Sequence, residues 1–182
     1  MTDEEYLVGL LNHDEAVLDD LMTQYSKLMW LVASKYLNTS NIGSREDIEE
    51  LISDVFIRLW ENPKGFDPSR GSIKTYLSIL TRSMAINKVK SVAKKQTEPL
   101  EFEKMSQLTV EENQMDWQSF YEAVMTLEEP TREIIIKRFF FEMKPSEIHQ
   151  ETGYDTKFID NKIYYGKKQL VEKFKQLGGS LS

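Results

Sequence analysis

The sequence predicts an all-α protein of two small helical domains joined by an acidic flexible linker, with a helix-turn-helix in the second domain. Apolar residues recur at three- and four-residue spacings through most of the chain, and no stretch shows a convincing period-two strand pattern. The periodicity is lost between Glu98 and Glu112, a stretch that contains Pro99 and is rich in acid. We therefore expect a domain over 1–96, a linker over 97–113, a domain over 114–177 and a tail over 178–182.

The first domain is expected to begin with three helices. Thr2 and Glu5 have the spacing of a capping box for a short helix, and a longer helix is expected from about Asp14 to Leu37. Ser44 with Asp47 is a plausible start for a third helix. Its apolar face is Ile48, Leu51, Ile52, Val55, Phe56 and Leu59. The opposite face is mostly acidic and is expected to face solvent.

A Pro- and Gly-containing loop over 62–71 separates this helix from a basic one. Each proline disfavours helix at the residue before it, and Ser72 is placed to cap the basic helix. On that helix Ile73, Leu77, Leu80 and Met84 share one face. Lys74, Ser78, Arg82 and Lys88 are expected around the other, which would direct positive charge towards a partner.

The second domain has the pattern of four helices. They are expected over Met115–Leu127, Thr131–Phe141, a short stretch following Pro145 and Thr156–Gln176, with a turn at Gly153. The last pair has the form of a helix-turn-helix. The residues expected to anchor its second helix are Phe158, Ile159, Ile163, Leu170 and Phe174. Those expected to face outward, where lysine can contact phosphate or guanine and asparagine can pair with adenine, are Lys157, Asn161, Lys162, Tyr165 and Lys168.

The charge of the chain is partitioned along it. The net charge is −7, yet residues 64–95 hold eight basic and one acidic side chain, whereas residues 98–129 hold one basic and nine acidic ones. Basic blocks separated by acidic blocks suit a chain that touches a polyanion at two places. Chance clustering of charge on solvated helix faces is the alternative that charge alone leaves open.

Several classes of protein are disfavoured by the composition. The 182 residues include no cysteine, which excludes disulfides, thiolate metal sites and thiol nucleophiles. The two histidines, His13 and His149, are far apart, and no Gly-rich phosphate loop or serine elbow is present. We expect no enzyme, no catalytic residue, no metal and no cofactor. No run reaches membrane-spanning length and no signal peptide is visible, so we expect a cytoplasmic protein without membrane insertion.

Three stretches together match the motif order of one family over nearly the whole chain. The first is Glu50-Leu51-Ile52-Ser53-Asp54-Val55-Phe56 through Leu59-Trp60, and the second, the specific one, is Phe66-Asp67-Pro68-Ser69-Arg70-Gly71-Ser72-Ile73-Lys74-Thr75-Tyr76-Leu77. The third comprises Leu127, Arg132-Glu133-Ile134-Ile135, Glu147-Ile148, Gly153 and Lys162-Ile163-Tyr164 through Leu170. In this order they resemble the bacterial RNA polymerase sigma factors of the extracytoplasmic-function (ECF) group.

The resemblance implies a subunit that joins core RNA polymerase and directs promoter-specific transcription initiation. The first domain would act as sigma region 2, with polymerase contacts at Glu50, Ser53, Asp54, Phe56 and Arg58. It would also melt the downstream promoter element and hold the single strand, through Phe66, Arg70, Lys74, Tyr76, Arg82, Ser83, Asn87 and Lys88. The second domain would act as sigma region 4 and bind duplex DNA at the upstream element through Lys157, Asn161, Lys162, Tyr165 and Lys168. An anti-sigma factor is a further partner that family behaviour suggests.

Some residues depart from the family pattern. Ser83 stands where many members have Asn and Asn87 where many have Asp, while His149 and Gly166 each replace an alanine. Core packing remains an alternative role for Tyr76. Two other functions also stay open: a helix-turn-helix regulator that binds duplex DNA without polymerase, and a helical adaptor whose basic faces bind an acidic protein.

Overall fold

The computed structural model describes residues 1–38, 43–95 and 117–177, and within these ranges every regular element is helical. This confirms the predicted all-α class. The chain divides into two compact units, residues 1–97 and 98–182. The stretch expected to be a linker, 97–113, and the expected tail, 178–182, lie outside the described residues.

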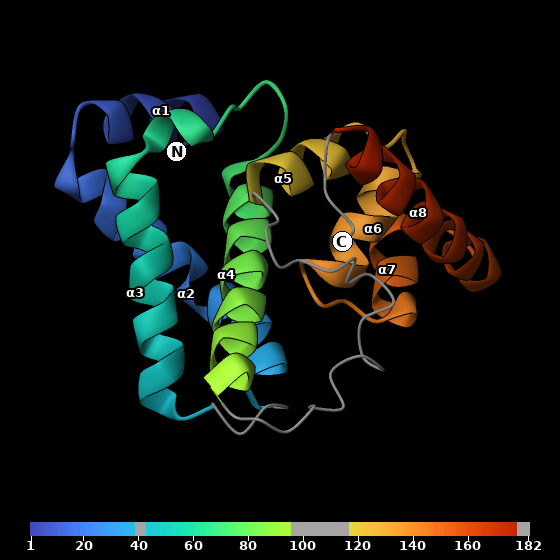
Figure 1. The fold of residues 1–182 in the computed structure, drawn as a ribbon. Helices are drawn as coiled ribbons and strands as arrows, with labels where there is room; N and C mark the ends of the chain where they lie inside the picture. The colour runs from blue at the N-terminus through green and yellow to red at the C-terminus, as the bar shows by residue number, and fades with distance from the viewer. Residues whose placement is uncertain (39–42, 96–116, 178–182) are drawn as a thin grey trace. The chain divides into compact units, whose positions relative to one another are not determined.

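The first unit is built around α2, which packs against both α3 and α4 (Figure 1). Its described elements are α1 (Asp3–Leu11), α2 (Glu15–Leu37), α3 (Arg45–Glu61), the 3-10 turn η2 (Pro63–Gly65) and α4 (Ile73–Lys95). The capping boxes predicted at Thr2 and Ser44 are both present. All six residues predicted for the apolar face of α3 are buried, which confirms the face of α3 that packs on the core.

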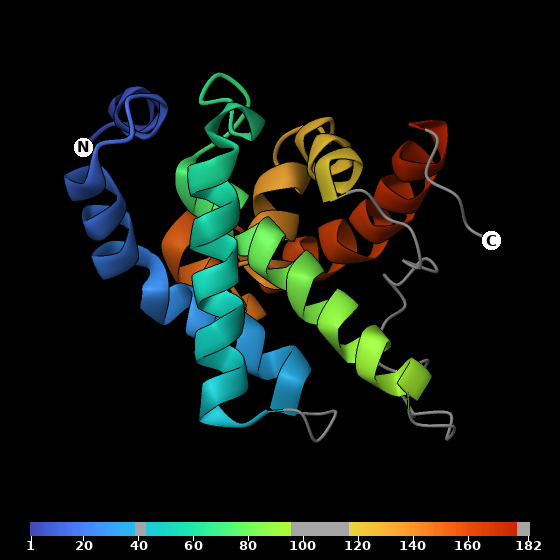
Figure 2. The ribbon, with the colours of Figure 1, turned by 60° about the vertical axis from the view of Figure 1, so that its left-hand side comes forward.

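A polar cluster and a close approach hold α1 against the N-terminal part of α2 (Figure 2). The hydroxyl of Tyr6 donates to Asp20 Oδ2 at 2.5 Å, and Gln24 Nε2 donates to that hydroxyl at 2.7 Å. Burial and the Asp20 carboxylate raise the pKa of Tyr6, while hydrogen bonds from Tyr6 and Gln24 lower the pKa of Asp20. A Cβ built on Gly9 would lie 2.4 Å from Val17 Cγ2, so only glycine permits the observed packing of these helices.

The second unit is assembled around α8, which contacts each of the three helices before it. Its described elements are α5 (Trp117–Met125), α6 (Thr131–Phe139), α7 (Pro145–Thr152) and α8 (Thr156–Gln176). Ile134, Ile148 and Ile159 bring α6, α7 and α8 to one buried cluster. Phe120 of α5 meets Phe174 of α8 edge-on, with ring centroids 6.5 Å apart.

Gly166 marks the closest approach between α6 and α8. A Cβ built at this position would lie 2.8 Å from Ile135 Cδ1, Ile135 Cγ1 and Thr131 Cγ2. Carbon atoms in ordinary contact are about 3.5–4.0 Å apart, so an alanine would not fit without movement of α6. The departure from alanine noted in the sequence therefore has a packing cause.

One predicted anchor of α8 is misplaced. Ile159, Leu170 and Phe174 are buried as predicted, but Phe158 is 37% exposed. Phe158 precedes Ile159 by about 100° around the helix, which places it on a flank of the buried face. There its ring packs against Tyr154, with centroids 5.3 Å apart, and Lys162 Nζ lies 5.3 Å above it.

Candidate nucleic-acid and polymerase interfaces

The outer face of α3 presents most of the residues predicted to contact polymerase. Ser53, Asp54 and Arg58 are exposed, and the Glu50 side chain is 65% exposed. Phe56 is different, since it is only 2% exposed and belongs to the core face of the helix. The helical spacing that placed Phe56 on the apolar face is incompatible with a direct contact, so the predicted assignment of Phe56 to the polymerase surface is corrected to a packing role.

An exposed isoleucine on this face was missed from the sequence. Ile57 is 53% exposed and lies about 60° or less around the helix from Ser53, Asp54 and Glu61. An apolar side chain among carboxylates is a typical centre for a protein contact, because it can be desolvated at little penalty. The exposure of Ile57 could have been predicted from the sequence, because Ile57 falls outside the three- and four-residue spacing of the buried residues of α3.

The loop between η2 and α4 is held by short-range hydrogen bonds. Asp67 Oδ1 accepts from the amide of Ser69 at 3.0 Å and from its hydroxyl at 2.7 Å, and these bonds lower the pKa of Asp67. Ser72 Oγ accepts from the amide of Thr75 at 3.2 Å and caps α4 as predicted. Arg70 in this loop is exposed, and so is Lys74 in the first turn of α4.

Four residues predicted to contact the opened strand are buried. Phe66 and Tyr76 are each 1% exposed and pack edge-to-face at a centroid distance of 5.5 Å. Arg82 and Ser83 are also buried, and Arg82 Nε donates to the hydroxyl of Tyr36 at 2.9 Å. Rings and guanidinium groups in these positions do not offer a face to a base. The structure gives all four residues packing roles, and the prediction that they contact the opened strand directly is corrected accordingly.

Lys88 joins α4 to α3 through an ion-pair cluster. Its Nζ lies 2.5 Å from Glu50 Oε2 and 3.7 Å from Asp47 Oδ1. Hydrogen bonds from Ser44, followed by the charge of Lys88, lower the pKa of Asp47. Lys88, which was predicted to contact DNA, and Glu50, which was predicted to contact polymerase, therefore form an ion pair with each other.

Lys74 and Lys88 share one side of α4, whereas Asn87 does not. Lys88 follows Lys74 by fourteen residues, which places it about 21 Å along the helix and about 40° around it. Asn87 is exposed, but it lies about 140° around the helix from Lys74. Of the residues predicted for the opened strand, Lys74 and Lys88 therefore lie on one side of α4 and Asn87 on another.

The turn between α7 and α8 is fixed by side chains of both helices. Gly153 adopts φ +75° at the end of α7, a conformation that glycine accepts without strain. His149 Nδ1 lies 2.7 Å from the carbonyl oxygen of Tyr154, which can only accept, so Nδ1 carries the proton. Asp155 Oδ2 accepts from the amide of Lys157 at 3.1 Å and caps α8. His149 therefore stabilises the turn.

Four exposed residues form a narrow stripe along α8. Lys157, Asn161 and Lys168 were predicted to face outward and do so. They lie within about 40° of one another around the helix and span about 16 Å of its length. Tyr164, which was not among the predicted contacts, lies in the same stripe and is 55% exposed. We call Lys157, Asn161, Tyr164 and Lys168 the α8 stripe.

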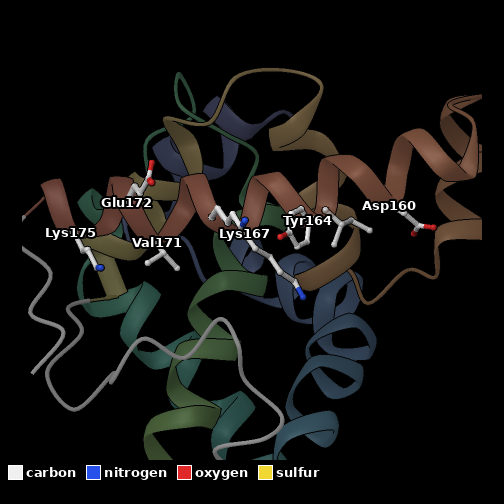
Figure 3. A pocket seen from close by; sticks show the side chains of 8 residues that line it. Asp160, Tyr164, Lys167, Val171, Glu172 and Lys175 are labelled. Atoms are coloured by element: carbon white, nitrogen blue, oxygen red, sulfur yellow. The ribbon is translucent and has the colours of Figure 1, made fainter.

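The other two predicted contacts of α8 lie beside the stripe. Tyr165 is 58% exposed and about 80° from Lys157, whereas Lys162 is only partly exposed and about 140° away, over the ring of Phe158. Tyr164 of the stripe, with Lys167 and Lys175, is among the side chains that line a pocket along α8 (Figure 3). The ammonium of Lys168 lies 4.4 Å from the Tyr164 ring centroid, and a hydrogen bond with Tyr164 raises the pKa of Lys168.

Neither a metal-binding cluster nor a membrane-spanning helix occurs within the described ranges. There, no group of three or more His, Asp or Glu side chains is arranged to hold a metal ion. Likewise, none of the helices in the part of the chain that the structure describes combines the length and the apolar character needed to cross a bilayer.

Comparison with known proteins agrees with the motif order. Residues 21–95 match the family described as Sigma-70 region 2. The ECF RNA polymerase sigma factor RpoE of Cereibacter sphaeroides is 25% identical over 155 residues, which cover 84% of this chain and 83% of that protein. A solved structure of CnrH in complex with the cytosolic domain of CnrY aligns over 93% of this chain and 95% of that chain, with 14% identity and a TM-score of 0.42.

The family match covers α3 and α4 with most of α2, and the match to RpoE extends over most of the chain. Sigma factors are initiation factors and not enzymes, which agrees with the absence of a recognisable reaction centre in the sequence. Residues 21–95 therefore match Sigma-70 region 2, and over most of its length the chain is similar to an ECF RNA polymerase sigma factor.

Proposed function

We propose that this sigma factor docks on core RNA polymerase with one face of α3, holds an opened promoter strand beside the start of α4, and reads upstream duplex DNA with α8. In this proposal residues 1–96 act as region 2 and residues 114–177 as region 4. The observation that carries it is the segregation of exposed charge. Acidic side chains gather on the outer face of α3, and cations gather in the loop before α4 and along α8.

The docking surface is the outer face of α3. Glu50, Asp54 and Arg58 offer charge, and Ile57 offers an apolar centre. A contact of this composition suits a partner surface with complementary basic and apolar groups. Phe56 supports the surface from behind through its place in the core.

Strand capture is proposed for the loop and first turn that carry Arg70 and Lys74. A protein without ATPase machinery can favour an open duplex only by binding the separated strand more tightly than the duplex. Exposed cations that follow one strand supply that preference through its phosphates. The buried pair Phe66 and Tyr76 supports the loop instead of stacking on bases.

Upstream recognition is proposed for the α8 stripe. A helix that follows a tight turn and exposes lysine, asparagine and tyrosine along about 16 Å suits the major groove of duplex DNA. Lys157 and Lys168 would contact phosphate or guanine, and Asn161 is placed to pair with adenine. We propose a cytoplasmic location because both partners, polymerase and promoter DNA, are intracellular.

Footprinting with and without core polymerase tests this function. We expect protection of an upstream element only when polymerase is present, together with permanganate-reactive thymines downstream. Replacement of Lys157 and Lys168 by alanine should weaken upstream protection and leave association with polymerase intact. Protection without polymerase would instead support a helix-turn-helix regulator, and the absence of any specific DNA binding would support an adaptor. An anti-sigma factor stays a predicted partner.

A further inference from the structure

The first turn of α4 donates a hydrogen bond to a side chain of α1. The amide of Ile73, the first residue of α4, donates to Asp3 Oδ1 at 2.8 Å across 70 positions of sequence. Amides in the first turn of a helix have no partner within the helix, so a side-chain acceptor stabilises them. Ser72 serves the amide of Thr75 in the usual local way. Asp3 completes the cap from a different helix.

Asp3 is itself held rigidly by its surroundings. It is the first residue of α1 and lies within the capping box formed by Thr2 and Glu5, in which Glu5 Oε2 accepts from the amide of Thr2 at 2.7 Å. The rest of α1 is fixed to α2 by Tyr6 and by the close approach at Gly9. Burial, and after it the charge of Asp3, raises the pKa of Tyr25 in α2, which agrees with the position of Asp3 beside that helix. The acceptor is therefore presented at a defined place.

The bond holds the beginning of the strand-binding surface in place. Arg70 lies three residues before Ile73 in the chain, and Lys74 follows it directly. Besides its short-range hydrogen bonds, the loop is anchored at its start by the packing of Phe66 on Tyr76, and the Asp3 bond adds an anchor at its end. Release of the Ile73 amide would allow the first turn of α4 to fray and the two cations to move.

We propose that Asp3 is a positioning residue for strand capture: from α1 it caps α4 and thereby fixes where Arg70 and Lys74 meet the opened strand. The inference rests on the proposed function of that loop. A capping role of Asp3 and a purely electrostatic role predict different effects of the Asp3→Asn substitution. A carboxylate near DNA would repel phosphate, so a purely electrostatic role predicts that Asp3→Asn raises promoter opening. A capping role predicts that Asp3→Asn retains opening, because the amide oxygen of asparagine accepts the same bond.

The test uses full-length protein and core polymerase with three variants. Asp3→Ala removes the acceptor, Asp3→Asn retains it, and Glu4→Ala removes one charge from an exposed position in the same helical turn. In the free protein, we expect Asp3→Ala to speed hydrogen exchange in the first turn of α4 by about fivefold, the usual effect of the loss of one helix cap, while exchange in α8 stays unchanged. Asp3→Asn and Glu4→Ala should exchange like the wild type.

With polymerase, permanganate reactivity of the promoter should fall about twofold to fivefold in Asp3→Ala and recover in Asp3→Asn, with upstream protection equal in all variants. Unchanged exchange in Asp3→Ala, faster exchange with unchanged opening, or an Asp3→Asn variant that behaves like alanine or opens more DNA would each overturn the proposal. Failure of the proposed function looks different. In that case alanine at both Arg70 and Lys74 would leave opening intact, while the exchange experiment would still report on the cap.

Discussion

Replacement of Gly166 by alanine sets two opposing effects against each other. In a helix interior alanine is favoured over glycine by about 1 kcal/mol, because glycine loses more backbone freedom on folding. Propensity alone therefore predicts that Gly166→Ala stabilises the second unit. The packing of α6 on α8 predicts the opposite, since the new Cβ would lie 2.8 Å from three carbon atoms of Ile135 and Thr131.

The steric effect should prevail. Each of the three contacts is shorter than an ordinary contact by about 0.7 Å, and Ile135 is fully buried and has little room to move. Insertion of one extra carbon into a well-packed core destabilises by roughly 1–3 kcal/mol. After the gain from propensity, a net loss of about 1 kcal/mol is expected. For a unit of this size that corresponds to a fall of about 4–8 °C in Tm.

Calorimetric unfolding of the full chain measures this, with a matched pair of controls at Gln169, which is exposed on the same helix. Gln169→Ala should be more stable than Gln169→Gly by the propensity difference alone, about 1 kcal/mol. Ile135→Val removes one of the contacting atoms, so it should destabilise the Gly166→Ala variant less than the wild type. A Gly166→Ala variant with a higher Tm than the wild type would refute the steric reasoning.

The described contacts support three other predictions. Asp54→Arg reverses a charge on the outer face of α3 and should abolish co-purification with core polymerase, whereas retention would count against that docking face. His149→Ala leaves the Tyr154 carbonyl without its donor and should lower the free energy of unfolding by about 1 kcal/mol in urea titrations; equal stability would mean that the bond contributes nothing. The lowered pKa of Asp47 implies stabilisation that is present above its unfolded value, about 3.9, and lost as the pH falls through the folded value. Asp47→Asn should therefore flatten the acid limb of a stability profile, and an unchanged limb would contradict this.

Helix positions were predictable because they depend on local patterns. The capping boxes at Thr2 and Ser44, the break around Pro63 and the turn at Gly153 are all visible as short-range spacings. The buried face of α3 follows in the same way from its three- and four-residue repeat. These features need no knowledge of which helix packs against which.

The site was harder to predict because exposure depends on neighbours in space. Arg82 lies on the side of α4 that the sequence pattern leaves polar, yet Tyr36 contacts it from a distant part of the chain. Tyr76 lies beside the apolar face of α4, and Phe66, ten residues earlier, packs against it. Lys88 was expected to be available to DNA and instead pairs with Glu50. In each case the deciding partner is more than nine residues away in sequence.

Glycine positions show the same limit. In the sequence, Gly166 indicates only a reduced helix propensity. That reduction is equally compatible with a helix kink, a close approach of another helix, or a glycine that the helix tolerates without a structural role. The choice among them depends on where Ile135 of α6 lies. The long-range cap of α4 by Asp3 is invisible for the same reason, because Ser72 already supplies a sufficient local cap signal.

The central claim is that this chain directs core RNA polymerase to promoters. Transcription of genomic DNA by purified core enzyme, with the 5′ ends of the RNA mapped by sequencing, tests it most directly. The account predicts that addition of the chain produces starts at reproducible positions that share an upstream and a downstream element. RNA ends that are the same with and without the chain would contradict it.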